Sequence, residues 1–405
     1  MVGAATTNKA REMKALVIGS MNCMPTEYAI LLTKYCEEVV HYYDADGNDT
    51  LSNPTIRWGD KSRERTRGIS LKKIFIRHHL SYLLPRLFHY NLVFQLSRAD
   101  LAILSGPSIS LARLVKGSGK IVALSYGNDI SLYCNPAWPE MAVEKVRGIK
   151  AIIKPQLIFL HSQFVKLQTA GLRSCTHYSY FITGMHPEID SLLDRILVGV
   201  NRPIRLPRYS INLSVPCTDR RADLLPHLKD AYRILFPVRF SDNELLGNKG
   251  WTLLFDGLRK YRSLGGKPFV CVCFKKGDYS AAQAYAKGIG IDDVIEWHDV
   301  VPFDTLEQYF TSADVVIEQL GSHWIGQGLY AMALGKPVIG RLTTEKQIEF
   351  FAGSGLLTAN DADSLADQLV NCESERFREE VGNRSRAFVA ARAAIEAEFM
   401  KWGIL

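Results

Sequence analysis

Short apolar runs that alternate with helix-patterned stretches are the feature that most constrains the fold of this chain. In the first half, such runs occupy 14–20, 39–43, 101–104 and 120–124, and the first of them, KALVIGS, contains a glycine where the strand would end. Uniformly apolar runs of this length are typical of parallel strands, because helices cover both faces of a parallel sheet. We therefore predict a Rossmann-like sheet here, with a helix over 27–38 after the first strand.

The same alternation restarts after a proline-punctuated stretch between positions 201 and 226, which is typical of a linker. Beyond it we predict strands over 232–238, 268–274, 294–297, 315–319 and 337–340, and helices over 251–261, 281–287, 306–310, 328–334 and 375–402. A chain of 405 residues exceeds what one core accommodates. We predict an α/β protein of two Rossmann-like domains facing a cleft, 14–210 and 225–385, with a C-terminal helix over 386–405 that packs back on the first domain.

Positive charge is concentrated in one segment, although the whole chain carries a net charge of only +7. Between positions 57 and 120 there are 13 Lys and Arg against three Asp and Glu, a block that attracts phosphate groups or is simply a solvated surface. Its part 71–96 mixes cations with bulky apolar residues. This mixture favours either contact with an anionic membrane or a buried helix with a basic outer face, broken at Pro85.

The remaining composition indicates a cytoplasmic protein. The eight cysteines are scattered without a C-x-x-C pair, and we expect Cys271 and Cys273 to share one face of a strand as reduced core residues. The segment 1–13 lacks the apolar core of a signal peptide, and no apolar run is long enough to span a bilayer. Any membrane contact is therefore expected to be peripheral.

The segment 312–340 has the pattern of an anion-binding site. A predicted strand delivers Glu318 to the carboxyl end of the sheet, and a loop containing Gly321, Gly326 and Gly328 then leads into a helix. Glycines let backbone amides approach an anion closely, and a helix start adds partial positive charge. This pattern suits a diphosphate.

Within this segment, AMALGKPVI at 331–339 resembles the E-A-M-A-x-G-x-P-V-I signature of GT-B glycosyltransferases with the retaining E-x7-E motif, the glycosyltransferase family 4-like group. The resemblance extends over most of 232–339. It implies that Arg239, Lys249 and Gly250 hold the diphosphate of a nucleotide-sugar donor, and that Lys276 lies near the nucleotide. In the first half, the turn 125–130 is similar to a family turn that contacts the sugar or the acceptor, with Asp129 as its acid.

The sequence departs from the signature at the two glutamates, where Ser322 and Tyr330 stand instead. Glu318 and His323 are the nearby polar candidates for substitute roles. Each candidate also has a structural interpretation: Glu318 as a strand-end acid, His323 as a loop surface residue, Asp129 as a helix N-cap. The predicted site comprises two catalytic candidates, Asp129 and Glu318, and the donor-binding candidates Gly19, Arg239, Lys249, Gly250, Lys276, His323, Gly326, Gln327, Gly328 and Tyr330.

The resemblance implies a metal-independent, retaining glycosyltransferase without a cofactor, whose donor is a nucleotide-diphosphate sugar. Its acceptor is expected to be a glycan or a lipid-linked intermediate of surface polysaccharide synthesis. The protein itself is expected to contact an anionic membrane peripherally through 57–120. A nucleotide-sugar epimerase and a non-catalytic binding scaffold are the alternatives. No nucleic-acid-reading motif accompanies the basic block, so nucleic acid is not expected as a partner.

Overall fold

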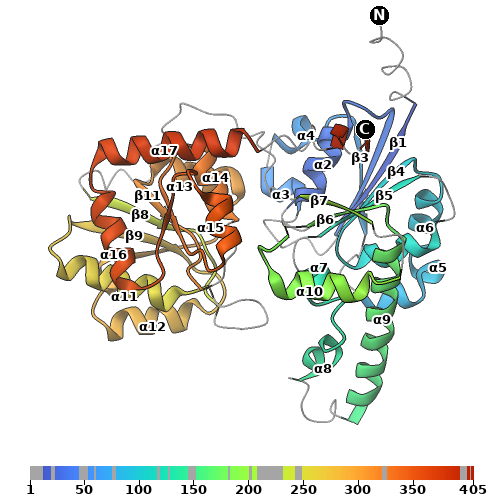
Figure 1. Cartoon of the computed structure of the whole chain (residues 1–405), viewed down its shortest axis with the longest axis horizontal. Helices are drawn as coiled ribbons and strands as arrows, with labels where there is room; N and C mark the ends of the chain where they lie inside the picture. The colour runs from blue at the N-terminus through green and yellow to red at the C-terminus, as the bar shows by residue number, and fades with distance from the viewer. Residues whose placement is uncertain are drawn as a thin grey trace, which may run out of the picture. The chain divides into compact units, whose positions relative to one another are not determined.

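The computed structural model describes residues 12–19, 23–44, 53–58, 61–74, 79–115, 119–125, 128–144, 152–180, 183–199, 203–207, 231–241, 249–321, 326–392, 399–401 and 403–405. The chain divides into two compact units (Figure 1). Unit 1 comprises Met1–Arg208 with Glu396–Leu405, and unit 2 comprises Tyr209–Ile395.

Unit 1 contains a parallel sheet of seven strands in the order β3-β2-β1-β4-β5-β6-β7 (Figure 1). The strands are β1 (Lys14–Ile18), β2 (Glu38–Asp44), β3 (Ile69–Ile74), β4 (Leu101–Leu104), β5 (Lys120–Leu124), β6 (His177–Tyr180) and β7 (Ile204–Pro207). The helices are α2 (Met24–Leu32), α3 (Pro54–Trp58), α4 (Ser62–Arg65), α5 (Pro85–Phe88), α6 (Tyr90–Leu96), α7 (Asn128–Ser131), α8 (Trp138–Val143), α9 (Lys154–Ser174) and α10 (Pro187–Ile196), with 3-10 turns η3 (His79–Leu83) and η4 (Gly106–Leu114).

Unit 2 contains a parallel sheet of six strands in the order β10-β9-β8-β11-β12-β13. The strands are β8 (Tyr232–Phe236), β9 (Phe269–Phe274), β10 (Ile295–His298), β11 (Val315–Ile317), β12 (Val338–Gly340) and β13 (Leu356–Thr358). The helices are α11 (Trp251–Ser263), α12 (Tyr279–Gly288), α13 (Phe303–Ser312), α14 (Gln327–Ala333), α15 (Glu345–Phe351), α16 (Ala362–Asn371) and α17 (Glu375–Ala390), with a 3-10 turn η7 (Asp292–Val294).

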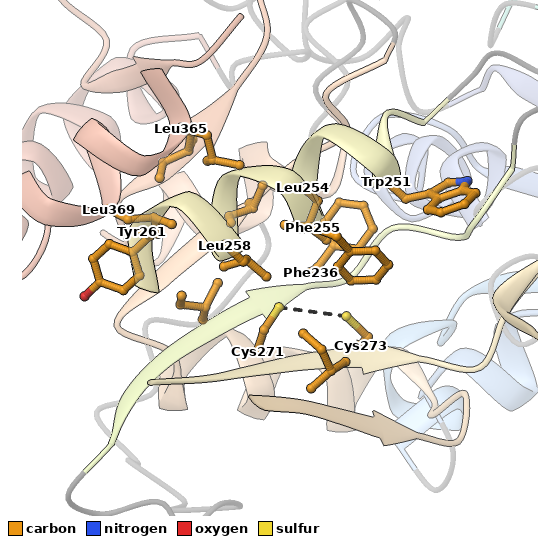
Figure 2. Close-up of a cluster of buried hydrophobic side chains, with 14 of the residues drawn as sticks. Phe236, Trp251, Leu254, Phe255, Leu258, Tyr261, Cys271, Cys273, Leu365 and Leu369 are labelled. Atoms are coloured by element: carbon orange, nitrogen blue, oxygen red, sulfur yellow. Dashed lines mark hydrogen bonds between the residues drawn. The ribbon is translucent and has the colours of Figure 1, made fainter. Parts of the chain in front are cut away.

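Alternation of side chains along the strands divides the core of unit 2 into two layers. Ile234, Phe236, Cys271 and Cys273 face one way and pack under α11, α12 and α16 (Figure 2). The intervening strand residues pack under α13, α14 and α17 on the opposite face. The Sγ atoms of Cys271 and Cys273 lie 3.8 Å apart in the first layer, so the predicted shared face of these two residues is confirmed.

The prediction of an α/β fold with two Rossmann-like sheets is confirmed, and the strands it named lie within a few residues of their observed positions. One of the two interpretations of 71–96, a buried helix broken at Pro85, was wrong for the part before Pro85, because the described residues there form the end of β3 and η3, while α5 and α6 follow. Pro85 is the first residue of α5, where its missing N–H costs nothing. The first helix begins at Met24 and ends at Leu32, earlier than predicted.

The last helix of unit 2 and the C-terminal residues belong to different units. α17 ends at Ala390 within unit 2, whereas Glu396–Leu405 belongs to unit 1. There the ring of Phe399 lies 5.4 Å from the ring of Tyr28, and Lys120 Nζ donates to the carbonyl of Gly403. Within the described ranges, no helix is both long and apolar enough to cross a bilayer.

Candidate functional site

Both sheets place candidate residues where the strand order reverses direction. The reversal lies between β1 and β4 in unit 1 and between β8 and β11 in unit 2. In open parallel sheets, ligands bind outside the carboxyl ends of the strands at such switch points, because the flanking loops diverge to opposite faces. Gly19 follows β1, and Glu318 follows β11. Lys249 and Gly250 immediately precede α11, the helix that follows β8.

Lys249 is held at the switch point of unit 2 by both backbone and side chain. Its N–H donates to Ser241 O at 3.0 Å, and its carbonyl accepts from Leu320 N at 3.0 Å. Its Nζ donates to Gln319 Oε1 at 2.5 Å. The loops after β8 and β11 are therefore joined through this one lysine, whose ammonium contacts a neutral amide oxygen.

The electrostatic surroundings of Lys249 disfavour its charge. Burial lowers the pKa of the ammonium to about 8, and the neighbouring guanidinium of Arg239 adds to the lowering. Glu318 raises the pKa but does not offset these two effects. Arg239 itself is exposed to solvent. The two cations thus repel each other in the loops after β8, and an anion bound by both would relieve this repulsion.

Glu318 is buried and interacts electrostatically with Lys249. One carboxylate oxygen accepts from the backbone N–H of Gly328, the second residue of α14, and the other accepts from Gln319 N at 3.1 Å. Burial raises the pKa of this carboxyl, while the hydrogen bonds from Gly328 and Gln319 act in the opposite direction. The acid therefore fixes the start of α14 relative to β11, which is what a positioning residue does.

Gly250 allows the two loops to approach each other. Its φ of 68° lies in the left-handed region, and a Cβ there would come within 2.2 Å of Gly321 N and 2.4 Å of Leu320 C. Any other residue would push the lysine-bearing loop away from the loop after β11.

We expect Gly250→Ala to lower the free energy of unfolding of unit 2 by about 2 kcal/mol, because left-handed strain and a backbone clash combine. Gly290→Ala is the matched control. Its φ is 74°, but nothing lies within 4 Å of its added Cβ, so it should cost only about 1 kcal/mol. Urea denaturation of both variants checks the difference. Equal losses would contradict a close approach at Gly250.

The other described candidates of unit 2 lie in the loop after β9 and at or within α14. The carbonyl of Lys276, after β9, accepts from Phe240 N at 3.0 Å, which ties its loop to the residue after Arg239. Gly326 caps α14 and Gln327 begins it. The ring of Tyr330 lies 4.9 Å from the ring of Phe303 in an edge-to-face contact. His323 and Ser322 lie outside the described residues.

The candidates of unit 1 surround the turn that follows β4. Gly19 has a φ of 142°, and a Cβ there would lie 2.6 Å from the Cβ of Ser105. Asp129 is buried, and its Oδ2 accepts from Gly106 N at 3.1 Å. Gln168 of α9 donates to Gly106 O at 2.9 Å. Gly19 and Asp129 are therefore brought to one turn at the β1–β4 switch point.

Sequence reasoning missed the two glutamines that complete these arrangements. Gln319 accepts from Lys249, and its position directly after Glu318 at a strand end could have indicated it. Gln168 is fully buried in the middle of α9 and contacts both Gly106 O and Asp129 O. A polar residue in a helix carries no sequence signal for a contact 62 positions away.

Comparisons with known proteins identify the fold of this chain but not its family or activity. No family model and no curated protein matches this sequence. Among solved structures, HepE from Anabaena in complex with UDP and glucose is 13% identical, with a TM-score of 0.63 over 97% of this chain and 98% of that one. Sucrose-phosphate synthase from Thermosynechococcus elongatus is 14% identical, with a TM-score of 0.62 over 97% and 98%. A glycosyltransferase from Rickettsia africae is 13% identical, with a TM-score of 0.60 over 96% of each chain.

These identities are too low to carry an activity, but the coverage is nearly complete in both directions. The likeness spans both sheets and their helices rather than one common subdomain. The chain therefore has the α/β fold of GT-B glycosyltransferases, built from two Rossmann-like units, as its sequence predicts.

Proposed function

We propose that this protein is a glycosyltransferase that moves a sugar from a nucleotide-diphosphate sugar to a hydroxyl acceptor. The observation that carries the proposal is the pair of cations, Lys249 and Arg239, at the β8–β11 switch point. A departing nucleoside diphosphate gains negative charge as the glycosidic bond breaks. Cations already oriented at that position stabilise this charge more than they stabilise the intact donor.

The start of α11 supports the same assignment. This helix of 13 residues begins directly after Lys249 and Gly250, so its partial positive charge adds to that of the lysine. The solved structures with the same fold include HepE bound to UDP-glucose, which supports a nucleotide sugar as the ligand class. In this proposal the diphosphate is neutralised by side chains and a helix start, and no metal or other cofactor is required.

The buried acids act by positioning in this proposal. Glu318 holds α14 against β11, and Asp129 holds the Gly106 turn of unit 1. Gly19 lets that turn pack closely, while Lys276, Gly326, Gln327 and Tyr330 belong to the donor side. We also propose that the reaction retains the anomeric configuration of the transferred sugar. Ser322 and Tyr330 stand at the positions of the first and second motif glutamates. We place the reaction in the cytoplasm, in polysaccharide assembly on a glycan or lipid-linked acceptor.

Thermal shifts with UDP-, GDP-, ADP- and CMP-sugars test the donor site. A ligand that binds the native state at a hundred times its Kd stabilises by about 2.7 kcal/mol, so the matching nucleotide should raise the Tm by about 5 °C. No shift with any nucleotide would refute donor binding and favour a non-catalytic scaffold. Product analysis with the binding sugar then separates two enzymes: an epimerase converts the sugar without an acceptor, whereas a transferase requires one.

A further inference from the structure

A group of exposed apolar side chains lies on two short helices of unit 1 that precede β4. Leu84, Leu87, Phe88, Tyr90 and Phe94 have exposed fractions between 45% and 72%. They belong to α5, α6 and the residue before α5, and the two helices lie next to each other (Figure 1). We name these five residues the apolar ridge. Contiguous exposed side chains of this size mark a contact surface rather than ordinary surface scatter.

The ridge stands on a buried base. His89, between the two helices, is buried, and its ring stacks on that of Tyr82 with centroids 4.3 Å apart. Its Nε2 lies 2.6 Å from Ser81 Oγ. Leu92 and Leu96 are buried on the inner side of α6. The outward direction of the apolar ridge is thus determined by packing beneath it.

Cations border the apolar ridge and acids are absent from it. Arg86 and Arg98 are both exposed, and the sequence from His79 to Ala99 contains no Asp or Glu. The guanidinium of Arg98 lies 5.2 Å from the ring centroid of Phe94, which in turn lies 6.5 Å from the ring of Tyr90. Arg98, Phe94 and Tyr90 therefore follow one another along α6 and the residues directly after it.

We propose that the apolar ridge docks unit 1 onto the surface of an anionic lipid bilayer. Leucine and aromatic side chains enter the interface, while the flanking arginines remain at the level of the phosphate groups. A second copy of the chain fits this surface less well. A two-fold interface would bring Arg86 and Arg98 against the same acid-free segment of the other copy. A bilayer containing anionic lipid supplies the missing counter-charge.

Cosedimentation of the full chain with vesicles tests the docking. Wild type should bind vesicles of phosphatidylcholine mixed with phosphatidylglycerol, bind pure phosphatidylcholine much more weakly, and dissociate at high salt. Replacing both arginines, Arg86→Glu with Arg98→Glu, should lower partitioning by roughly 30-fold or more. Leu87→Ser with Phe88→Ser should lower it by at least about tenfold.

Two matched controls lie in unit 2. Ile348→Ser removes an apolar side chain that is 56% exposed, and Arg376→Glu reverses an exposed cation; neither should change binding. All replaced residues are exposed, and unchanged thermal melts would verify the folds. Failure of wild type to bind anionic vesicles, or wild-type binding by both ridge variants, would overturn the proposal. Self-association that is lost in the Leu87→Ser, Phe88→Ser variant without a change in vesicle binding would assign the ridge to a second copy instead. The vesicle experiments contain no nucleotide sugar, so their outcome does not depend on whether the proposed donor site is correct.

Discussion

Lys249→Met should lower kcat/KM for sugar transfer by roughly 100- to 1,000-fold, the usual effect of removing one preorganised group that stabilises developing negative charge. Methionine retains most of the apolar length of the side chain and loses the ammonium. The lysine charge is already disfavoured by burial and by Arg239, so removing it should leave the Tm close to that of wild type. Steady-state kinetics with the donor identified by thermal shift measures the effect.

Lys275→Met is the control for loss of a cation at the same edge of the sheet. Lys275 follows β9, and its ammonium pairs with Asp299 at 3.1 Å on the surface. Its replacement should leave kcat/KM within about twofold of wild type, because exposed ion pairs contribute little. If both variants lose activity equally, the effect reflects general positive charge and Lys249 has no specific role.

The pH dependence of donor binding independently tests whether the charge of the Lys249 ammonium contributes to affinity. The pKa of Lys249 is lowered to about 8, so the charged form predominates at pH 7 and is lost as the pH rises through 8. Affinity for the nucleoside diphosphate should therefore fall above that pH in wild type. A bound anion opposes deprotonation, so the fall is delayed in the complex. Lys249→Arg, which does not titrate in this range, should bind without such a fall, and calorimetry across pH 7 to 10 compares the two.

Glu318→Ala should lower the free energy of unfolding of unit 2 by about 3 kcal/mol, because it leaves two buried backbone N–H groups without their acceptor. Those donors are Gly328 N at the start of α14 and Gln319 N. The smaller side chain of alanine also leaves a cavity at this buried position. Urea denaturation followed by circular dichroism measures the loss. Glu318→Gln should lose less, since its amide oxygen can still accept one of the two hydrogen bonds.

Glu349→Ala is the control for removal of a glutamate. Its carboxylate is exposed and pairs with Lys346 at 2.7 Å within α15, so its loss should change stability by less than about 0.5 kcal/mol. Should Glu318→Ala unfold like wild type but abolish transfer, the carboxylate would act in the chemistry and the positioning role would be wrong.

Most of the strands that the sequence predicted lie inside their sheets, although the edge strand β10 was also predicted and the inner strand β6 was not. Leu101–Leu104 and Lys120–Leu124 were located to the residue, because both faces of such strands are buried and their composition is correspondingly apolar. The edge strand β3, Ile69–Ile74, was missed. Its side chains are partly or fully exposed and include Lys72 and Lys73, so it lacks the apolar signal.

The candidate site, like the sheets, was predicted from the sequence only in part. The position of an acid at a strand end before a glycine-containing loop indicated Glu318, whereas Lys249 and Gly250 were indicated by the resemblance to the GT-B signature. Their mutual contacts were not predictable. Gln319 accepts a hydrogen bond from Lys249, which lies 70 positions earlier in the sequence. Gly250 packs against the backbone of Gly321.

By itself, the sequence determined that this chain forms two parallel sheets and which segments supply their central strands, since burial on both faces leaves a local apolar record in each strand. Only the tertiary structure decided that Glu318, directly after β11, accepts a hydrogen bond from α14, and that Asp129 accepts one from Gly106. It also decided that the segment 84–94 exposes its apolar side chains. The physical reason is that strand order, and with it the set of loops that meet at each switch point, arises from long-range pairing, which leaves no periodic trace in the residues it brings together.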